Sequence, residues 1–159
     1  MVENIRLTAA PALRTTFEPY PVNPYRWHAV VETPEYYQTA EINTWTGDIL
    51  TDAQRDVIYK PADTPAVEAA KRTPLGQVYL DWGKWAIVRD VGQEPVPALE
   101  PPNLPPGRNW TTVEFSDLRF AYSFLSTSGD PRQTPLSGWV YIVDNKDEAG
   151  EGMGNNVQK

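Results

Sequence analysis

The chain has 159 residues, no cysteine, one histidine and a formal net charge of −7. The absence of cysteine excludes disulfide scaffolds, thiolate catalysis and cysteine-ligated zinc, and an acidic chain without clustered Lys and Arg does not suit a nucleic-acid partner. No apolar run approaches the roughly 20 residues of a membrane-spanning helix, so we expect a soluble chain of one domain.

The pattern of residues in the first half of the sequence predicts short strands. Residues 1–12 are expected to be a lead-in and 13–144 a single domain. Leu13 to Phe17 predicts a strand that runs into a proline-rich stretch. Alternation of apolar and polar residues predicts further strands at Arg26 to Thr33 and Tyr36 to Trp45, with another short strand at Val57 to Tyr59.

Two helix starts follow, each with a capping threonine before a proline, at Thr64-Pro65 and Thr73-Pro74. In the second helix, four apolar residues recur at helical spacing and are expected to pack on the sheet. These residues are Leu75, Val78, Tyr79 and Trp82.

The second half predicts a strand at Trp85 to Val91, a proline-rich loop at 95–109, and a long strand from Trp110 to Phe124. In that long strand Val113 and Phe115 share one face while Leu118 and Phe120 share the other, which predicts either a bulge near Ser116-Asp117 or a strand buried on both faces.

Gly138 to Asp144 predicts the last strand, and 145–159 a polar flexible tail. Together these elements predict an α+β domain: a twisted antiparallel sheet of about five to seven strands with two short helices packed on one face.

Four short motifs occur in a characteristic order: the Tyr20 to Trp27 lead-in, the Val30 to Thr33 strand, the Thr64 to Val67 helix start, and Phe115 to Phe120. In this order they resemble the C-terminal extramembrane domain of a bacterial inner-membrane family of metal-dependent hydrolases. Seven positions match the family pattern: Pro21, Asn23, Pro24, Trp27, Glu32, Asp117 and Arg119.

The resemblance implies a parent protein in the bacterial inner membrane, with several membrane helices before this domain and a His-rich, hydrolase-like motif among them. A divalent metal would belong to that membrane part, which is also the implied partner. No cofactor, metal ligand set or catalytic residue is then expected in this chain. The side of the membrane stays open.

Five residues are candidates for binding: Trp27, His28, Glu32, Asp117 and Arg119. His28 and Glu32 alternate to one face of a strand, but a metal site needs three or four donors, so we expect an ordinary strand histidine. Asp117 and Arg119 can pair to grip a polar ligand or to fix the local backbone, and we favour the second.

The aromatic residues have two interpretations. Trp27, Trp82 and Trp139 fall on strand or helix faces, where core packing explains them. Trp45 and Trp110 border turns and are expected to be more exposed, and one exposed pair would be enough for a binding platform.

The leading functional hypothesis is therefore an accessory domain of the membrane-bound hydrolase-like parent, for interaction or substrate presentation. The alternative is a binding module for an extracytoplasmic glycan or peptide, and an autonomous hydrolase comes last.

Overall fold

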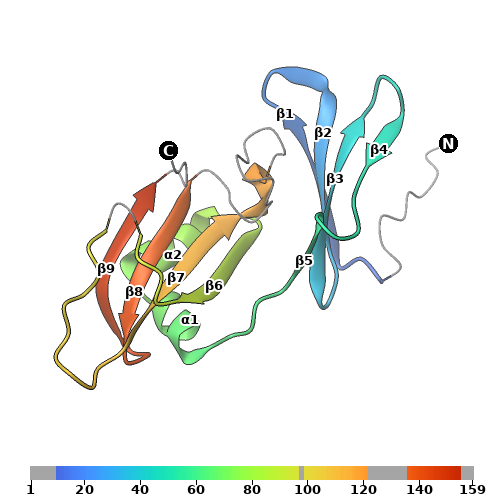
Figure 1. The fold of residues 1–159 in the computed structure, drawn as a ribbon. Helices are drawn as coiled ribbons and strands as arrows, with labels where there is room; N and C mark the ends of the chain where they lie inside the picture. Colours follow the sequence, from blue (N-terminus) through green and yellow to red (C-terminus); the bar gives the residue numbers. More distant parts are fainter. Residues whose placement is uncertain (1–9, 97–98, 122–135, 155–159) are drawn as a thin grey trace. The chain divides into compact units, whose positions relative to one another are not determined.

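The computed structural model describes residues 10–96, 99–121 and 136–154. The chain divides into two compact units, 1–60 and 61–159, and each contains its own antiparallel sheet (Figure 1). Antiparallel pairing is as predicted. The prediction of one continuous sheet is wrong: there are two sheets, of five and four strands. The alternation that marks a strand does not specify its pairing partner.

Residues 10–60 of the first unit contain five strands: β1 (Arg14–Tyr20), β2 (Asn23–Glu32), β3 (Tyr36–Asn43), β4 (Asp48–Leu50) and β5 (Val57–Tyr59). The order is β1-β2-β3-β4, and β5 pairs with the other part of β3. Strand β5 confirms the short strand predicted at these residues, whereas β4 was not predicted.

The β2–β3 hairpin forms at the predicted turn. The backbone N–H of Thr33 donates to the carbonyl of Tyr36 at 2.9 Å, and the Thr33 hydroxyl accepts from the N–H of Tyr36 at 3.0 Å. This closure sets the register in which Val31 faces Gln38 and Trp27 faces Ile42. The turn thereby fixes which residues meet at the far end of the hairpin.

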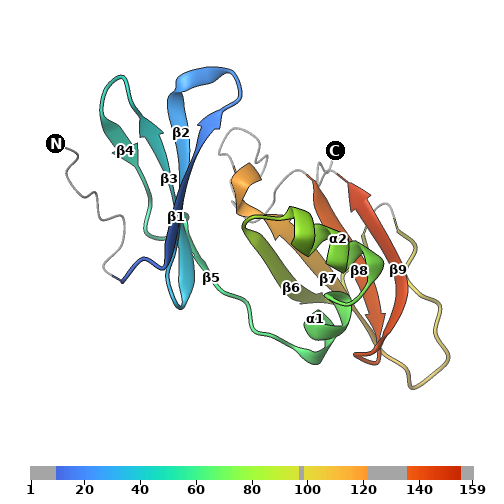
Figure 2. The ribbon, with the colours of Figure 1, turned by 180° about the vertical axis from the view of Figure 1, so that it is seen from behind.

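In the part of the second unit that the structure describes there are two helices, four strands and a single 3₁₀ turn. These are α1 (Pro65–Ala70), α2 (Pro74–Trp82), β6 (Ala86–Gly92), β7 (Trp110–Asp117), η1 (Leu118–Phe120), β8 (Ser137–Val143) and β9 (Asp147–Gly154). The strand order is β6-β7-β8-β9, with every pairing antiparallel. Both helices lie on one face of this sheet (Figure 2).

Both predicted helix starts are confirmed. The Thr64 hydroxyl accepts from the N–H of Val67 at 3.2 Å, and the Thr73 hydroxyl accepts from the N–H of Gly76 at 3.1 Å. Each cap satisfies an N–H that has no partner within the helix and contributes about 1 kcal/mol. Pro65 and Pro74 begin the helices, where a proline lacks no needed hydrogen bond.

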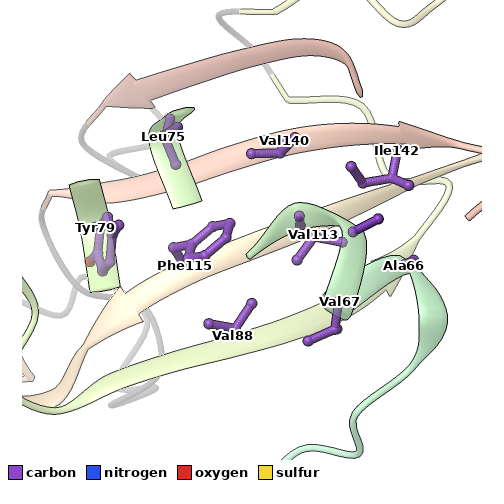
Figure 3. Packing of buried hydrophobic residues seen from close by; sticks show 11 residues of the cluster. Ala66, Val67, Leu75, Tyr79, Val88, Val113, Phe115, Val140 and Ile142 are labelled. Carbon is purple, nitrogen blue, oxygen red and sulfur yellow. The ribbon is translucent and has the colours of Figure 1, made fainter. Parts of the chain in front are cut away.

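The main core of the second unit lies between the helices and the sheet (Figure 3). Val67, Leu75 and Tyr79 pack there against Phe115 and Val140. The prediction that all four apolar positions of α2 pack inward holds for only two of them, because Val78 is 67% and Trp82 is 44% exposed. A helix of nine residues presents only a narrow stripe to a sheet.

The opposite face of the second sheet has a smaller cluster of Val96, Trp139 and Tyr141, with Leu99 and Trp110 packed against it. The proline-rich segment supplies Val96 and Leu99. The Tyr141 hydroxyl joins segment and strand, accepting from the N–H of Val96 at 2.8 Å and donating to the carbonyl of Leu99 at 3.0 Å. Part of the 95–109 loop therefore belongs to the packed structure.

Two further predictions are wrong. Residues 147–154 of the expected tail form β9, which pairs with β8. There is no bulge near Ser116-Asp117 in β7: the strand ends at Asp117 and a 3₁₀ turn follows, which changes the direction in which Leu118 points. The other alternative is confirmed, because consecutive residues 112–117 of β7 are buried and the strand is therefore buried on both faces. The end of the predicted Trp110 to Phe124 strand, at 122–124, lies outside the described residues.

Among the described residues, no helix is long and apolar enough to cross a membrane.

Candidate functional site

The five candidate residues fall into two groups in separate units. Trp27, His28 and Glu32 lie on β2 in the first unit. In the second unit, Asp117 is the last residue of β7 and Arg119 lies in the 3₁₀ turn η1.

Asp117 is completely buried and is bound twice by one neighbour. Its Oδ1 accepts from the backbone N–H of Arg119 at 2.9 Å, and its Oδ2 accepts from the Nε of Arg119 at 3.0 Å. The first bond caps the 3₁₀ turn η1. A carboxylate held in this way stabilises the point at which the strand stops.

The Arg119 side chain connects this turn to the end of α2. Its Nη2 donates to the carbonyl oxygen of Trp82 at 3.2 Å, an oxygen that the helix itself leaves without a partner. The guanidinium carbon lies 4.8 Å from the ring centroid of Trp82 and 5.2 Å from that of Phe120. These two rings stack on each other with an angle of 6° between their planes. Arg119 therefore packs against aromatic rings in addition to forming its ion pair with Asp117.

Tyr79 of α2 lies in the core between the helices and the sheet (Figure 3). Its hydroxyl donates to the carbonyl of Leu136 at 3.1 Å. Burial raises the pKa of Tyr79 above its ordinary value, and the negative charges of Asp117 and Glu114 raise it further. The phenol is therefore held neutral, as a hydrogen-bond donor.

Glu114 belongs to a buried ion pair that the sequence did not reveal. The buried carboxylate faces Arg89 across β6 and β7, and Nε of Arg89 donates to it. Both residues fit the strand alternation, but only the register shows that they are adjacent.

In the first unit, Glu32 accepts from two cations. Nζ of Lys60 lies 2.7 Å from its Oε1, and Nε of Arg14 lies 3.3 Å from its Oε2. Lys60 also lies over the ring of Tyr37, 5.1 Å from the centroid. Burial raises the pKa of Tyr37, and the charge of Glu32 adds to the effect. Glu32 thus links β1, β2 and the end of β5.

His28 is buried in the middle of β2, opposite Glu18 of β1 and Glu41 of β3. In the described ranges no group of three or more His, Cys, Asp or Glu side chains is arranged to hold a metal ion. The structure places His28 inside the sheet and leaves it little access to a ligand.

Trp27 lies in the first half of β2 and makes a local hydrogen bond to the start of that strand. The indole N–H of Trp27 donates to the carbonyl of Pro24 at 3.0 Å, and the Asn23 side chain accepts from the N–H of Tyr25 at 3.0 Å. The lead-in motif therefore shapes the backbone locally.

Two aromatic side chains remain accessible at the end of the first sheet. Trp45, in the β3–β4 turn, is 75% exposed, and Tyr25 is 50% exposed. Their rings meet edge to face, with centroids 5.3 Å apart. The prediction of an exposed Trp45 is confirmed. Trp110 is instead half-buried, with its ring 5.0 Å from that of Tyr141.

The sequence did not identify Tyr25 as the partner of Trp45. Its place follows from the register, which sets Arg26 opposite Asn43 and so brings Tyr25 beside the following turn.

Comparison with known proteins gives no match: no family model, curated protein or solved structure is significantly similar to this chain.

Proposed function

We propose that this chain is an accessory domain of a membrane-bound, metal-dependent hydrolase-like protein of the bacterial inner membrane. Its role is interaction or substrate presentation, and the chemistry belongs to a membrane part that carries the divalent metal. The proposal rests on the resemblance of the ordered motifs between Tyr20 and Phe120.

One observation supports an interaction role. The motif residues hold the backbone: Asp117 caps a turn, Pro24 accepts from Trp27, and Glu32 joins three segments. An exposed aromatic pair, Tyr25 and Trp45, lies in the first unit, and Tyr25 directly follows Pro24 in β2. Exposed aromatic groups on a rigid frame favour recognition.

Two experiments test the proposal. The genomic reading frame is expected to encode several membrane helices before this domain, whereas a secretion signal in their place would contradict it. The purified chain is expected to leave p-nitrophenyl phosphate and p-nitrophenyl acetate intact in the presence of Mn²⁺ or Zn²⁺. Turnover that scales with the concentration of the chain would show an autonomous hydrolase.

The alternative is a binding module for an extracytoplasmic glycan or peptide that acts without a membrane partner. The exposure of Trp45 supports it equally, and the reading frame separates the two proposals.

A further inference from the structure

Strand β6 lies at one margin of the second sheet (Figure 1). It pairs with β7 on one side, and among the described residues no strand pairs with its other side. The register with β7 is regular from Ala86 to Asp90 and becomes irregular between Asp90 and Gly92. A free edge presents N–H and C=O groups that can bind another extended backbone. The segment 86–90 is therefore a candidate site for strand pairing.

The hydrogen bonds to β7 determine which backbone groups of β6 point outward. In antiparallel strands, hydrogen-bonded pairs alternate with pairs that are not hydrogen-bonded. The N–H of Leu118 donates to the carbonyl of Trp85 at 3.1 Å, in register with the pairs between β6 and β7. Alternation from this pair directs the backbone groups of Ile87 and Arg89 towards β7. The backbone groups of three residues point instead to the free side: Ala86, Val88 and Asp90.

The two charged side chains of this segment are bound within the second unit. Nε of Arg89 donates to the carboxylate of Glu114 on β7. The carboxylate of Asp90 accepts from the hydroxyl of Thr111 and from the N–H of Gly92. Charged side chains directed away from an edge strand keep other strands from pairing with it. Because both charges are held by neighbours in their own unit, this protection is weak at β6.

The other sheet edges have features that hinder pairing. β1 contains Pro19, which has no N–H to donate, and β4 and β5 have only three residues each. The register of β9 with β8 is irregular, and β9 carries three acidic residues: Asp147, Glu148 and Glu151. The segment 86–90 of β6 has none of these features, and it contains the β-branched residues Ile87 and Val88.

We propose that β6 pairs antiparallel with β6 of a second copy of this chain, across a twofold axis at Val88. Val88 then faces the partner's Val88, which adds a β-branched cross-strand pair, and Ala86 faces the partner's Asp90. Only this axis lets all three outward residues pair with one another, so that each of their N–H and C=O groups is bonded.

The charges of the segment are compatible with this axis. Ile87 faces the partner's Arg89, so no like charges lie directly opposite each other. An axis at Arg89 would instead set two guanidinium groups opposite each other, which is destabilising. A strand of a different protein is the competing occupant, because any extended backbone can pair with a free edge. The second copy is favoured because the segment complements itself in both hydrogen bonding and charge.

Sedimentation equilibrium of the full chain at several concentrations is expected to show monomers and dimers in equilibrium. Val88→Pro removes the N–H at the axis but no hydrogen bond to β7, so it should weaken dimerisation about tenfold or more. Circular dichroism shows whether the variant keeps its fold.

Met153→Pro is the matched control on the opposite edge of the same sheet. The N–H of Asp144 donates to the carbonyl of Asn109 at 2.9 Å, and alternation from this pair directs the backbone groups of Gly138 towards β7. Met153, which is opposite Gly138 and exposed, therefore has an outward N–H. The control should dimerise like the wild type.

Disulfide cross-linking tests the register by a second route, because the chain has no cysteine of its own. Residues of a hydrogen-bonded pair lie about 5.5 Å apart at Cα, within reach of a disulfide. A mixture of Ala86→Cys and Asp90→Cys chains is expected to cross-link faster than either variant alone.

Three results would overturn the proposal. They are a monomer at every concentration, a dimer that folded Val88→Pro leaves unchanged, and equal cross-linking of the mixture and the separate variants. A monomer would leave the edge of β6 to a strand of another protein. None of these results depends on the accessory role proposed above.

Discussion

Asp117 binds Arg119 through both carboxylate oxygens, one to the backbone N–H and one to the guanidinium. The same guanidinium reaches the carbonyl of Trp82 at the end of α2. Two residues of the Phe115 to Phe120 segment thus join the end of a strand to the end of a helix. This arrangement explains the Asp-x-Arg spacing without a ligand.

Replacing Asp117 is therefore expected to affect stability and leave ligand binding unchanged. Asp117→Ala removes the cap and leaves Arg119 without its carboxylate, at a cost of about 3 kcal/mol in the free energy of unfolding. Urea denaturation measures the change. Asp81→Ala, at an exposed helical position, is the control and should lie within about 0.5 kcal/mol of the wild type. An unchanged melting temperature for Asp117→Ala would contradict the structural role.

The close approach of α1 and α2 gives a second prediction. A Cβ added at Gly76 would lie 2.1 Å from the carbonyl oxygen of Ala70, so Gly76→Ala must push the helices apart. We expect a loss of about 3 kcal/mol, at the upper end for overpacking. Gln77→Ala, one residue further and exposed, should be nearly neutral. Equal stability of the two variants in thermal denaturation would contradict this, because it would show that α1 and α2 can move apart at little cost in free energy.

Tyr79 predicts the response of the second unit to alkaline pH. Its pKa is raised in the folded chain, mainly by burial, so the fold favours the neutral phenol. The stabilisation is complete below the ordinary pKa of about 10 and is lost as pH rises towards the folded value.

Tyr79→Phe cannot ionise there, so its unfolding midpoint should fall less steeply above pH 10 than that of the wild type. Near pH 7 the variant should lose about 1 kcal/mol, for the hydrogen bond to Leu136. Parallel curves from pH 8 to 12 would argue against the buried phenol.

Features that depend on neighbouring residues in the chain could be predicted. Thr64-Pro65 and Thr73-Pro74 specify helix starts because cap and proline act within one turn. Strands β2 and β3 follow from alternation and a short turn. Trp45 could be predicted as exposed because it stands in a turn.

Features that depend on distant pairing could not be predicted. Strand β9 consists of Asp, Glu, Gly, Ala and Met, residues that mostly disfavour strands. It forms because its backbone pairs with the edge of β8. The side chain of Leu99 also packs close to it, 3.8 Å from the positions that a Cβ atom would take at Gly150 and Gly152. The separation into two sheets, the Arg89–Glu114 pair and the place of Tyr25 likewise depend on register.

Glu32 provides the last prediction, which tests its ion pairs and its effect on Tyr37 in the first unit. Glu32→Gln weakens the bonds to Lys60 and Arg14 and should cost about 1 kcal/mol, because both partners keep contact with water. It should also lower the pKa of Tyr37, since Glu32 contributes to raising it, but not to the ordinary value, because burial is the larger cause. Ultraviolet titration, with Tyr37→Phe to assign the signal, measures this shift. A Tyr37 pKa that is the same in Glu32→Gln as in the wild type would contradict this electrostatic role of Glu32.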